Sequence, residues 1–430
     1  MCTIKIHPLQ KPIQAEVTLP GSLSDTIRAL NIAAMIKGSV RITNALKSDD
    51  TYAMANILKT LGITVEEGEG YFTVHGDISD IQNKAYELHV NISGRTARIA
   101  LALLCIVPGE KTLTCQEAFK KRPIGDLVDG LRQLGAEISY LEQEGHLPVH
   151  INSQTLSPGI VKMNGKVSSQ YFSAIMMIAP MIGEIRIEVI GKQASRPFID
   201  ITTDIMKTFG VNVINHAYKQ YIIPGNQQYA YIPEYLVEAD AIAASYFWGI
   251  AAVTQSTIKI LHLSPRSPQG DIYFADILGS MGCLVEKNEQ EQWIAVTGTN
   301  NLQAITVDMN DTPDSVLTLA VVAAFAKGTT HITGLSHLKV KETDRIEAPK
   351  KELEKMGIEV SATNDSLTIT GGAPHGAEIE THDDHRVAMA FAVAGSKIAG
   401  IEIKNPDVVN KSFPEFWKTV EKLGIGIEKK

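Results

Sequence analysis

The 430-residue sequence has little of what secreted, membrane-spanning or nucleic-acid-binding chains carry. Its four cysteines are far apart and show no CxxC or His/Cys ligand spacing, so neither a disulfide framework nor a zinc site is indicated. The longest apolar runs, such as residues 316–326, fall far short of the roughly 20 residues that span a bilayer. A net charge of -8 disfavours polyanionic partners, which argues against nucleic acids and membrane surfaces.

The first ten residues alternate polar and apolar side chains and lack the uninterrupted apolar core of a secretory signal. We therefore expect a cytoplasmic protein. With 44% hydrophobic and 20% charged residues, the composition is that of an ordinary globular chain long enough for two large domains. An anionic small-molecule substrate remains compatible with the negative net charge, because a pocket can be locally basic.

A unit of roughly 70 residues recurs six times along the chain. In each copy a helix-like stretch ends in a bulky apolar residue and a glycine, and a short alternating segment follows. Glycine readily takes the left-handed conformation that ends a helix, so each copy predicts a helix, its end and a following strand. The six copies are residues 57–65, 131–138, 205–213, 277–285, 352–360 and 420–427.

A second landmark, a glycine followed by alternating apolar residues, precedes most of these helices and predicts a further strand. It occurs at residues 38–46, 109–115, 183–191, 328–335 and 400–406. A charged loop follows each of these strands, at residues 48–50, 120–123, 195–197, 341–345 and 411–414. One charged loop is most simply a solvated one. Five at the same repeat position favour a common cleft, where helix N-termini attract anions.

Six units predict two α/β domains of three repeats each. The N-terminal strand, which ends at Pro20, is expected to cross to the second domain. The predicted domains are therefore residues 21–239 and residues 1–20 plus 240–430.

Ten segments, in order along nearly the whole chain, resemble 5-enolpyruvylshikimate-3-phosphate (EPSP) synthase. They include PGSLSDTIRAL, GKVSSQYFSAIMMIAP, TPDSVLTLA, KVKETDR, DDHRVAMAFAV and NKSFPEF. The resemblance implies a fold of two inside-out α/β barrels, each of three βαβαββ units, that close over the substrates. It also implies a transferase that moves the carboxyvinyl group of phosphoenolpyruvate to the 5-hydroxyl of shikimate 3-phosphate, on the pathway to chorismate and aromatic amino acids.

The resemblance assigns the shikimate 3-phosphate site residue by residue. Ser24 and Arg28 match the residues that hold the carboxylate, and the planar fork of an arginine suits that group. Paired hydroxyls at a helix start and an ammonium group are sensible phosphate ligands. The acceptor site implied in this way is Ser24, Arg28, Ser168, Ser169, Gln170, Ser195, Asp314, His337 and Lys341. Taken alone, Ser168 and Ser169 are typical of plain helix caps.

Phosphoenolpyruvate carries a carboxylate and a phosphate, so its site must be rich in cations. The residues that match it are Gly94, Arg95, Arg122, Gln170, Arg345, Arg386 and Lys411. Four of these cations, Arg122, Arg345, Arg386 and Lys411, come from four repeats and are hard to explain as surface ion pairs. Of the neighbouring groups, His385 is expected to orient Arg386 or to cap its helix rather than to titrate in catalysis.

The implied reaction is an addition followed by an elimination, and it needs an acid and a base on either side of the reacting carbons. Asp314 matches the base that contacts the acceptor hydroxyl, and Glu342 matches the acid that serves the methylene carbon. Asp314 is also compatible with a cap on the apolar helix predicted after it. The reaction requires no metal and no organic cofactor.

The chain departs from the family pattern at several of these positions. The first-motif lysine is replaced by Leu23, and in the next motif an asparagine and a threonine are replaced by Ile92 and Arg95. His337 replaces an acceptor-side asparagine, and Phe198 replaces a tyrosine. Loss of an ammonium beside two anions should cost several kcal/mol of binding and transition-state stabilisation. Our hypothesis is that the Arg95 guanidinium takes over from that lysine and, because it lies in the glyphosate site of the family, lowers glyphosate sensitivity.

Three alternatives stay open at this point. The chain can be an enolpyruvyl transferase for another hydroxyl acceptor, since the changes at Leu23, Ile92, Arg95 and His337 fit a changed acceptor. It can be a binding homologue that lost its activity, although such a protein has no need of Asp314 and Glu342. The UDP-N-acetylglucosamine branch fits less well, because the position and spacing of its catalytic cysteine differ from those of the present chain. A monomer is the default expectation.

Overall fold

The computed structural model describes residues 2–152 and 155–430. The chain divides into two compact units, Gly21–Val237 and Met1–Pro20 with Glu238–Lys430. We call them the N-unit and the C-unit. Each has a hydrophobic core of its own, which extends through all of its repeats.

Every sheet of the described residues has the same pattern of four strands. The first two strands are parallel, and each later strand pairs antiparallel with its neighbour. In the N-unit the sheets are β14(Glu234–Leu236)-β3(Gly38–Thr43)-β5(Tyr71–Gly76)-β4(Thr64–Gly68), β6(Tyr86–His89)-β7(Lys111–Thr114)-β9(Val149–Ile151)-β8(Ile138–Tyr140) and β10(Gly159–Asn164)-β11(Ile185–Ile190)-β13(Gln220–Ile223)-β12(Ile214–His216).

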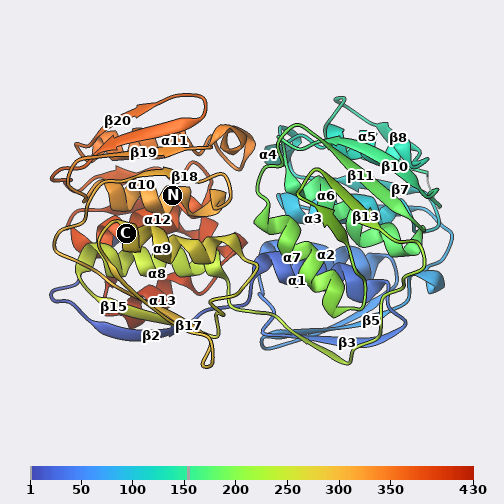
Figure 1. Ribbon diagram of the computed structural model, residues 1–430, viewed down its shortest axis with the longest axis horizontal. Helices are drawn as coiled ribbons and strands as arrows, with labels where there is room; N and C mark the ends of the chain where they lie inside the picture. Colours follow the sequence, from blue (N-terminus) through green and yellow to red (C-terminus); the bar gives the residue numbers. More distant parts are fainter. Residues whose placement is uncertain (1, 153–154) are drawn as a thin grey trace. The chain divides into compact units, whose positions relative to one another are not determined.

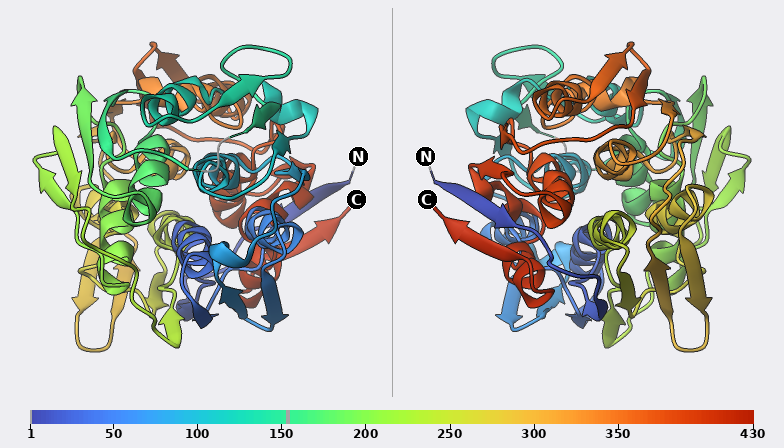
Figure 2. Two further views of the ribbon diagram at one scale, coloured as in Figure 1. Left: turned by 90° about the vertical axis from the view of Figure 1, so that its right-hand side faces the viewer. Right: turned by 90° about the vertical axis from the view of Figure 1, so that its left-hand side faces the viewer.

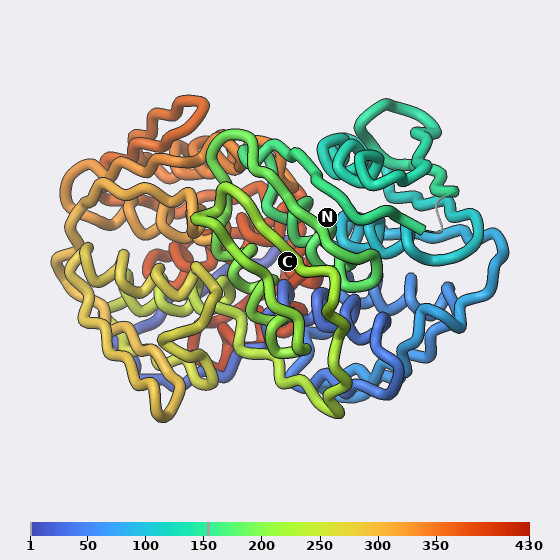
Figure 3. Tube along the Cα trace, turned by 45° about the vertical axis from the view of Figure 1, so that its right-hand side comes forward, coloured from blue at the N-terminus to red at the C-terminus, as the bar shows by residue number. Residues whose placement is uncertain are grey.

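The C-unit repeats this pattern with strands borrowed from the start of the chain. Its sheets are β2(Gln14–Thr18)-β15(Thr257–Leu261)-β17(Trp293–Thr297)-β16(Leu284–Asn288), β18(Thr306–Asp308)-β19(Thr329–Thr333)-β21(Ser366–Thr370)-β20(Glu359–Ala362) and β22(Glu378–Ile379)-β23(Glu402–Lys404)-β1(Thr3–His7)-β24(Gly426–Lys429). Strand β1 pairs with β23 and β24, and β2 pairs with β15. The blue N-terminal trace therefore runs beside yellow segments in Figures 1 and 3.

Each repeat contributes one inner helix, buried on nearly every side, and one outer helix with a single buried face. The apolar sequences of the inner helices explain their burial, because a helix that is apolar all round must be covered on every side. Figures 1 and 2 show the helices of each unit enclosed by its sheets, which is the inside-out arrangement. The inner helices are α1(Leu23–Ala34), α3(Gly94–Leu104), α6(Ser169–Ile178), α8(Ala241–Thr254), α10(Val316–Ala323) and α12(His385–Lys397); the outer ones are α2(Asp49–Thr60), α5(Gly125–Gln133), α7(Pro197–Thr208), α9(Phe274–Ser280), α11(Glu347–Lys355) and α13(Phe416–Lys422).

The glycines of the repeat end the outer helices as predicted. Each follows a bulky apolar C-cap residue and has a positive φ, between 79° and 102°, which glycine adopts without a steric penalty. A strand begins shortly after each of them. The six positions are Gly62, Gly135, Gly210, Gly282, Gly357 and Gly424. The second landmark also has a sixth copy that sequence inspection missed, because the left-handed residue before β15 is Gln255, with φ 60°, and not a glycine.

The inner helices begin at polar caps. Ser22, Ser93 and Ser168 accept a hydrogen bond from a first-turn N–H in the N-unit, and Asp240 and Asp384 do so in the C-unit. Such caps hold the helix start in one geometry and leave its other N–H groups pointing outward. Several predicted site residues lie in these first turns, immediately after the caps.

We expect Gly62→Ala to lower the free energy of unfolding by about 1 kcal/mol, because an alanine resists the left-handed conformation. No heavy atom lies within 4 Å of the added Cβ, so the loss reports the backbone alone. Gly62→Asn is the matched control and should lose less, since asparagine tolerates positive φ. Urea unfolding of the three proteins measures the difference, and an alanine variant as stable as the wild type would contradict the backbone argument.

Candidate active site

A buried ion cluster in the C-unit centres on Arg345, whose side chain is 2% exposed. Its Nε donates to Asp384 at 2.7 Å. Its two terminal nitrogens donate to Asp314 and to Glu342, each at 2.8 Å. Three carboxylates thus converge on one guanidinium, whose planar fork of donors suits such a set of partners.

Two further cations complete the cluster. Arg386 donates to the second oxygen of Asp314 at 3.2 Å and to the Tyr246 hydroxyl at 3.1 Å. Lys411 donates to the second oxygen of Glu342 at 2.6 Å. Among the described residues the cluster therefore holds three cations and three carboxylates. Burial of so many charges is tolerable because each is paired and hydrogen-bonded.

The repeat explains why these side chains meet. Asp314 lies in η4(Pro313–Ser315), just before inner helix α10, and Arg386 lies in the first turn of inner helix α12. Glu342 and Arg345 lie between η5(Ser336–Val340) and outer helix α11. Lys411 ends η6(Pro406–Lys411), before outer helix α13. The cluster is thus built from equivalent ends of successive repeats.

Two sequence-based alternatives about these residues were wrong. Asp314 does not cap α10, whose cap residue is Ser315, because its carboxylate is taken up by the two arginines. His385 does not cap α12, because Asp384 does so by accepting from the Arg386 N–H at 2.9 Å. Burial, with Arg386 next, holds the pKa of His385 well below its ordinary value, so its ring is neutral.

The predicted acceptor residues of the C-unit also lie together. His337 is buried, and burial, followed by the charge of Lys341, lowers its pKa to about 4, while Asp314 opposes this shift. These electrostatic effects place Lys341 and Asp314 near the imidazole. His337 Nε2 is buried and has no hydrogen-bond partner within the described parts of the chain. A neutral imidazole offers a substrate hydroxyl one donor and one acceptor.

In the N-unit, Arg28 is buried among protein partners. It donates to Thr202 Oγ1 at 2.8 Å and to the Ser24 carbonyl at 2.9 Å, and its last nitrogen reaches Ser173 and the Phe198 carbonyl at 3.2 Å. Arg28 is therefore buried within its helix and not a solvated surface residue. Burial lowers the pKa of Arg28 to about 10, with Asp25 opposing the shift. The Ser24 Oγ, in the same helix, is buried and has no partner among the residues that the structure describes.

The predicted donor residues of the N-unit form a second group. A Cβ placed on Gly94 would lie 2.7 Å from the Arg122 guanidinium, so a side chain at this position would displace the guanidinium from the start of α3. Gln170, in the first turn of α6, accepts from Arg98 at 2.7 Å. Arg98 also donates to the carbonyl of Pro123, next to Arg122. One arginine on α3 therefore ties the glutamine to the loop that carries Arg122.

Arg95 and Leu23 lie where the departures from the family pattern concentrate. Leu23 is 2% exposed and belongs to the N-unit core, so this position has become part of the packing. The Arg95 guanidinium lies over the Phe198 ring, 5.7 Å from its centroid. Its charge also lowers the pKa of Arg28, which places it near that residue. Arg95 thus brings positive charge toward the helix on which Leu23 replaces the lysine.

The predicted serines occupy three distinct structural roles. Ser168 caps α6 by accepting from the Gln170 N–H at 3.3 Å, as the simpler interpretation expected. Ser169 is buried in the first position of that helix. Ser195 is buried just before α7, with a positive φ of 53° that a non-glycine residue adopts only where its surroundings hold it.

Two residues of the site were missed from sequence. Asp384 binds Arg345 and caps α12, and Arg98 binds Gln170. Each had a signal: Asp384 lies two residues before Arg386 in the DDHR motif, and Arg98 is a charged residue immediately before the apolar second half of its helix. A charge in a buried segment requires a buried partner, but the sequence alone does not predict which residue that partner is.

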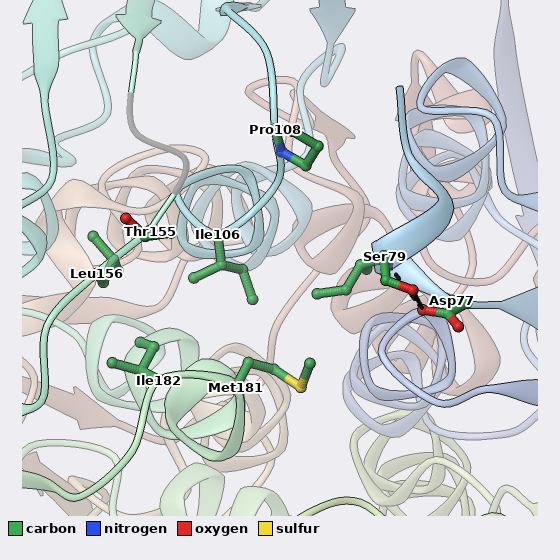
Figure 4. Close-up of a pocket in the computed structure, with 9 residues that line it drawn as sticks. Asp77, Ser79, Ile106, Pro108, Thr155, Leu156, Met181 and Ile182 are labelled. Atoms are coloured by element: carbon green, nitrogen blue, oxygen red, sulfur yellow. Dashed lines mark hydrogen bonds between the residues drawn. The ribbon is translucent and has the colours of Figure 1, made fainter. Parts of the chain in front are cut away.

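A cavity of about 380 Å³ opens elsewhere in the N-unit. Figure 4 shows Ile106, Pro108, Leu156 and Met181 lining it, with Asp77 and Ser79 hydrogen-bonded at one side. It adjoins the segments that follow α3 and α6, at the opposite ends of these helices from Gly94 and Gln170. No predicted site residue lines it.

The described residues contain neither a helix that could span a membrane nor a group of metal-ligating side chains. None of their helices combines the length and apolarity needed to cross a bilayer. Within the same residues, no three His, Cys, Asp or Glu side chains are grouped so as to hold a metal ion.

The inside-out arrangement of two three-repeat units places the chain in a fold class shared with a solved enolpyruvyl transferase and with solved EPSP synthases. The enolpyruvyl transferase NikO from Streptomyces tendae shares the fold, with a TM-score of 0.79 and 16% identity, covering 100% of this chain and 99% of that one. An EPSP synthase from Acinetobacter baumannii superposes with a TM-score of 0.85 and 26% identity, covering 100% of both chains.

Within that class, the chain belongs to the EPSP synthase (3-phosphoshikimate 1-carboxyvinyltransferase) family, which matches residues 8–420. The 3-phosphoshikimate 1-carboxyvinyltransferase of Sulfurovum sp. is 41% identical over 98% of this chain and 99% of its own. That of Vibrio vulnificus is 40% identical over the same shares. The chain is therefore a transferase, and the inside-out α/β fold expected from the sequence is confirmed.

We expect acid to destabilise the protein partly through His337. Its pKa of about 4 in the folded chain lies below the ordinary 6.5, so the unfolded chain takes up the proton first as the pH falls. This contribution to stability is complete above pH 6.5 and is lost as the pH falls toward 4. Relative to His337→Asn, the wild type should lose about 2 kcal/mol between pH 8 and pH 5. Parallel pH dependences of the two unfolding free energies would contradict the buried, neutral imidazole.

Proposed function

We propose that this chain transfers the carboxyvinyl group of phosphoenolpyruvate to the 5-hydroxyl of shikimate 3-phosphate and releases phosphate, in the shikimate pathway. Family membership over nearly the full length supports the reaction. The single structural observation that carries the proposal is the buried cluster in which Asp314 and Glu342 share Arg345 with Asp384. The two carboxylates that we propose as acid and base are bonded to cations there, which supports a site for an anionic donor and proton transfer together.

Arg345, Arg386 and Lys411 of the C-unit, with Gly94, Arg95, Arg122 and Gln170 of the N-unit, are proposed to bind phosphoenolpyruvate. The three C-unit cations are held in fixed directions by carboxylates, so little reorganisation is needed when the donor arrives. In the N-unit, the contact of Arg122 with Gly94 and the bond from Arg98 to Gln170 hold two further contacts in place.

Asp314 is proposed to take the proton of the acceptor hydroxyl as its oxygen attacks C2 of the donor, while Glu342 gives a proton to C3. The tetrahedral adduct then loses phosphate, and C3 returns a proton as the double bond forms again. Two cations flank each carboxylate and favour its ionised form. A bound dianion offsets those cations, so donor binding raises the tendency of Glu342 to hold the proton that it must deliver.

The proposed shikimate 3-phosphate residues offer groups suited to both of its ends. Arg28 and the Ser24 hydroxyl face the carboxylate, and the hydroxyls at the start of α6, together with Ser195 and Lys341, face the phosphate. The neutral imidazole of His337 is proposed to contact a ring hydroxyl. The full set is Ser24, Arg28, Ser168, Ser169, Gln170, Ser195, Asp314, His337 and Lys341. We take the two compact units as the two domains, and a cytoplasmic monomer as the working form.

Another hydroxyl acceptor is the second candidate, favoured by the burial of Leu23 in the core and by His337 at an acceptor position. Phosphate release from phosphoenolpyruvate, measured with and without shikimate 3-phosphate, tests acceptor identity directly. Rescue of a strain that lacks the shikimate-pathway enzyme separates both candidates from a binding protein without activity. Phosphate release that ignores shikimate 3-phosphate, together with failed rescue, would refute the proposed acceptor.

Asp314→Asn and Glu342→Gln should each lower kcat by about 10²- to 10⁴-fold, the usual worth of a positioned acid or base. Stopped phosphate-release assays with both substrates give kcat and KM. Asp311→Asn is a matched control, because Asp311 precedes the same helix and its carboxylate accepts a hydrogen bond from the Asn310 side chain, outside the cluster. Wild-type turnover in either site variant would refute the role of that carboxylate.

Arg95→Thr, which restores the family residue, should raise the KM for phosphoenolpyruvate and lower kcat about 10-fold or more if Arg95 replaces the missing ammonium. The same variant should gain sensitivity to glyphosate, because the smaller threonine reopens the space that the arginine fills. Steady-state kinetics with a glyphosate titration measures both. Unchanged KM and kcat would exclude compensation, and wild-type inhibition as strong as in ordinary family members would exclude the steric argument.

A further inference from the structure

The segment that leads into α12 has an unfavourable backbone. Between β22 and α12 it carries two consecutive non-glycine residues with positive φ, His382 at 52° and Asp383 at 55°. Residues with a Cβ avoid this conformation, so contacts from outside must hold it. The next residues are Asp384 and Arg386, both in the ion cluster, so the shape of this turn decides where two of its charges point.

Glu352, on outer helix α11, provides such contacts. Its side chain is 1% exposed. One carboxylate oxygen lies 2.8 Å from His382 Nε2. The other accepts from the Glu380 N–H at 3.1 Å and from Lys355 at 2.6 Å. The buried Glu352 carboxylate therefore binds both the backbone before the turn and the side chain of His382.

The second left-handed residue is held from another direction. Asn405 donates its side-chain N–H to Asp383 at 3.0 Å. Asn405 is the cap residue of η6, the element that ends in Lys411. The turn is therefore bonded both to the helix that follows Arg345 and to the element that carries Lys411.

Helix α11 holds the turn at two points. Arg345, just before the helix, binds Asp384 through two nitrogens at 2.7 and 3.1 Å. Glu352, within the helix, binds the turn through His382 and Glu380. Two separated attachments between the same segments remove the freedom to rotate that a single ion pair would leave.

We propose that Glu352 is a positioning residue for the reaction: through the His382 turn it sets the direction of Asp384 and Arg386, and so the geometry of the donor-binding cations. The inference rests on the proposed function, because it takes Arg345 and Arg386 as ligands of phosphoenolpyruvate. Glu352 is bonded to Lys355, the Glu380 N–H and His382 rather than to Arg386, so its effect must pass through the turn. A role in stability alone would lower the melting temperature and leave the kinetic constants of the folded enzyme unchanged.

Kinetics of Glu352→Ala, measured well below its melting temperature, tests this directly. We expect kcat/KM for phosphoenolpyruvate to fall by about 10- to 100-fold, as small misplacements of binding groups do. The KM for shikimate 3-phosphate should change less, since most of its proposed ligands lie on other segments, whereas Asp314 is bonded to Arg345 and Arg386. Glu352→Gln keeps one acceptor oxygen and should lose less. Glu354→Ala, an exposed glutamate of the same helix, is the matched control and should behave as wild type.

His382→Asn removes the contact between the imidazole and Glu352, and asparagine still tolerates the positive φ at this position. This variant keeps the test possible if Glu352→Ala does not fold. It should reduce kcat/KM for phosphoenolpyruvate, and the double variant with Glu352→Gln should be no worse than the poorer single one, because the two share a contact. Folded Glu352 variants with wild-type kinetics, equal losses toward both substrates, or fully additive losses would each overturn the proposal.

Arg386→Lys separates this inference from the proposed function. If it leaves phosphoenolpyruvate kinetics unchanged, the donor-site assignment fails, and a loss in Glu352→Ala would then have to arise elsewhere, which overturns the positioning role. If Arg386→Lys impairs the donor and the Glu352 variants do not, the positioning role alone fails.

Discussion

The neutralisation of buried charge is the constraint on which the C-unit depends. Three carboxylates and three cations lie out of water among its described residues, and each is tolerable only because opposite charges are within hydrogen-bond distance. Such a cluster is costly to break and poorly suited to mere stabilisation, since apolar packing would serve as well. The carboxylates fix the orientation of the cations, which therefore need not reorganise when an anion binds.

The repeat provides the positions that this cluster needs. Every inner helix begins at a polar cap or a 3-10 turn, and every outer helix is preceded by a loop or a 3-10 turn, so equivalent ends of three repeats meet within one unit. Glycines at the ends of the outer helices allow a short return strand in each copy, which keeps the repeats in register. The fold thus brings the polar starts of the inner helices of one unit close to each other.

The N-unit reaches a similar result with fewer ion pairs. Arg28 and Arg98 are buried by donating to carbonyl, hydroxyl and amide oxygens rather than only to carboxylates. The inner helices of the N-unit have serine caps, whereas α8 and α12 of the C-unit have aspartate caps. Cations whose hydrogen bonds go to neutral oxygens keep more of their positive charge available to an anion than cations bonded to carboxylates do. The two units therefore offer anions different electrostatic surroundings from the same repeat.

Much of this protein is decided locally and could be inferred from the sequence alone. The glycine that ends each outer helix, the alternating strand after it and the mainly apolar inner helices depend on neighbours within a few residues, so the six repeats and the α/β class follow from pattern. The motifs that resemble the family likewise indicate which residue types serve the site. The sixth copy of the second landmark could not be predicted from its sequence pattern, because Gln255 takes a conformation expected of glycine.

Only the tertiary structure decides which charges are partners. Asp314 had two compatible roles from sequence, and the approach of Arg345 and Arg386 from later repeats removes the cap. Asp384, Arg98 and Glu352 gain their importance from side chains distant in the chain, or from a left-handed turn that no local rule requires. The physical reason is that electrostatic pairing acts through space: its energy depends on distance and burial, and both are set only once the repeats have packed.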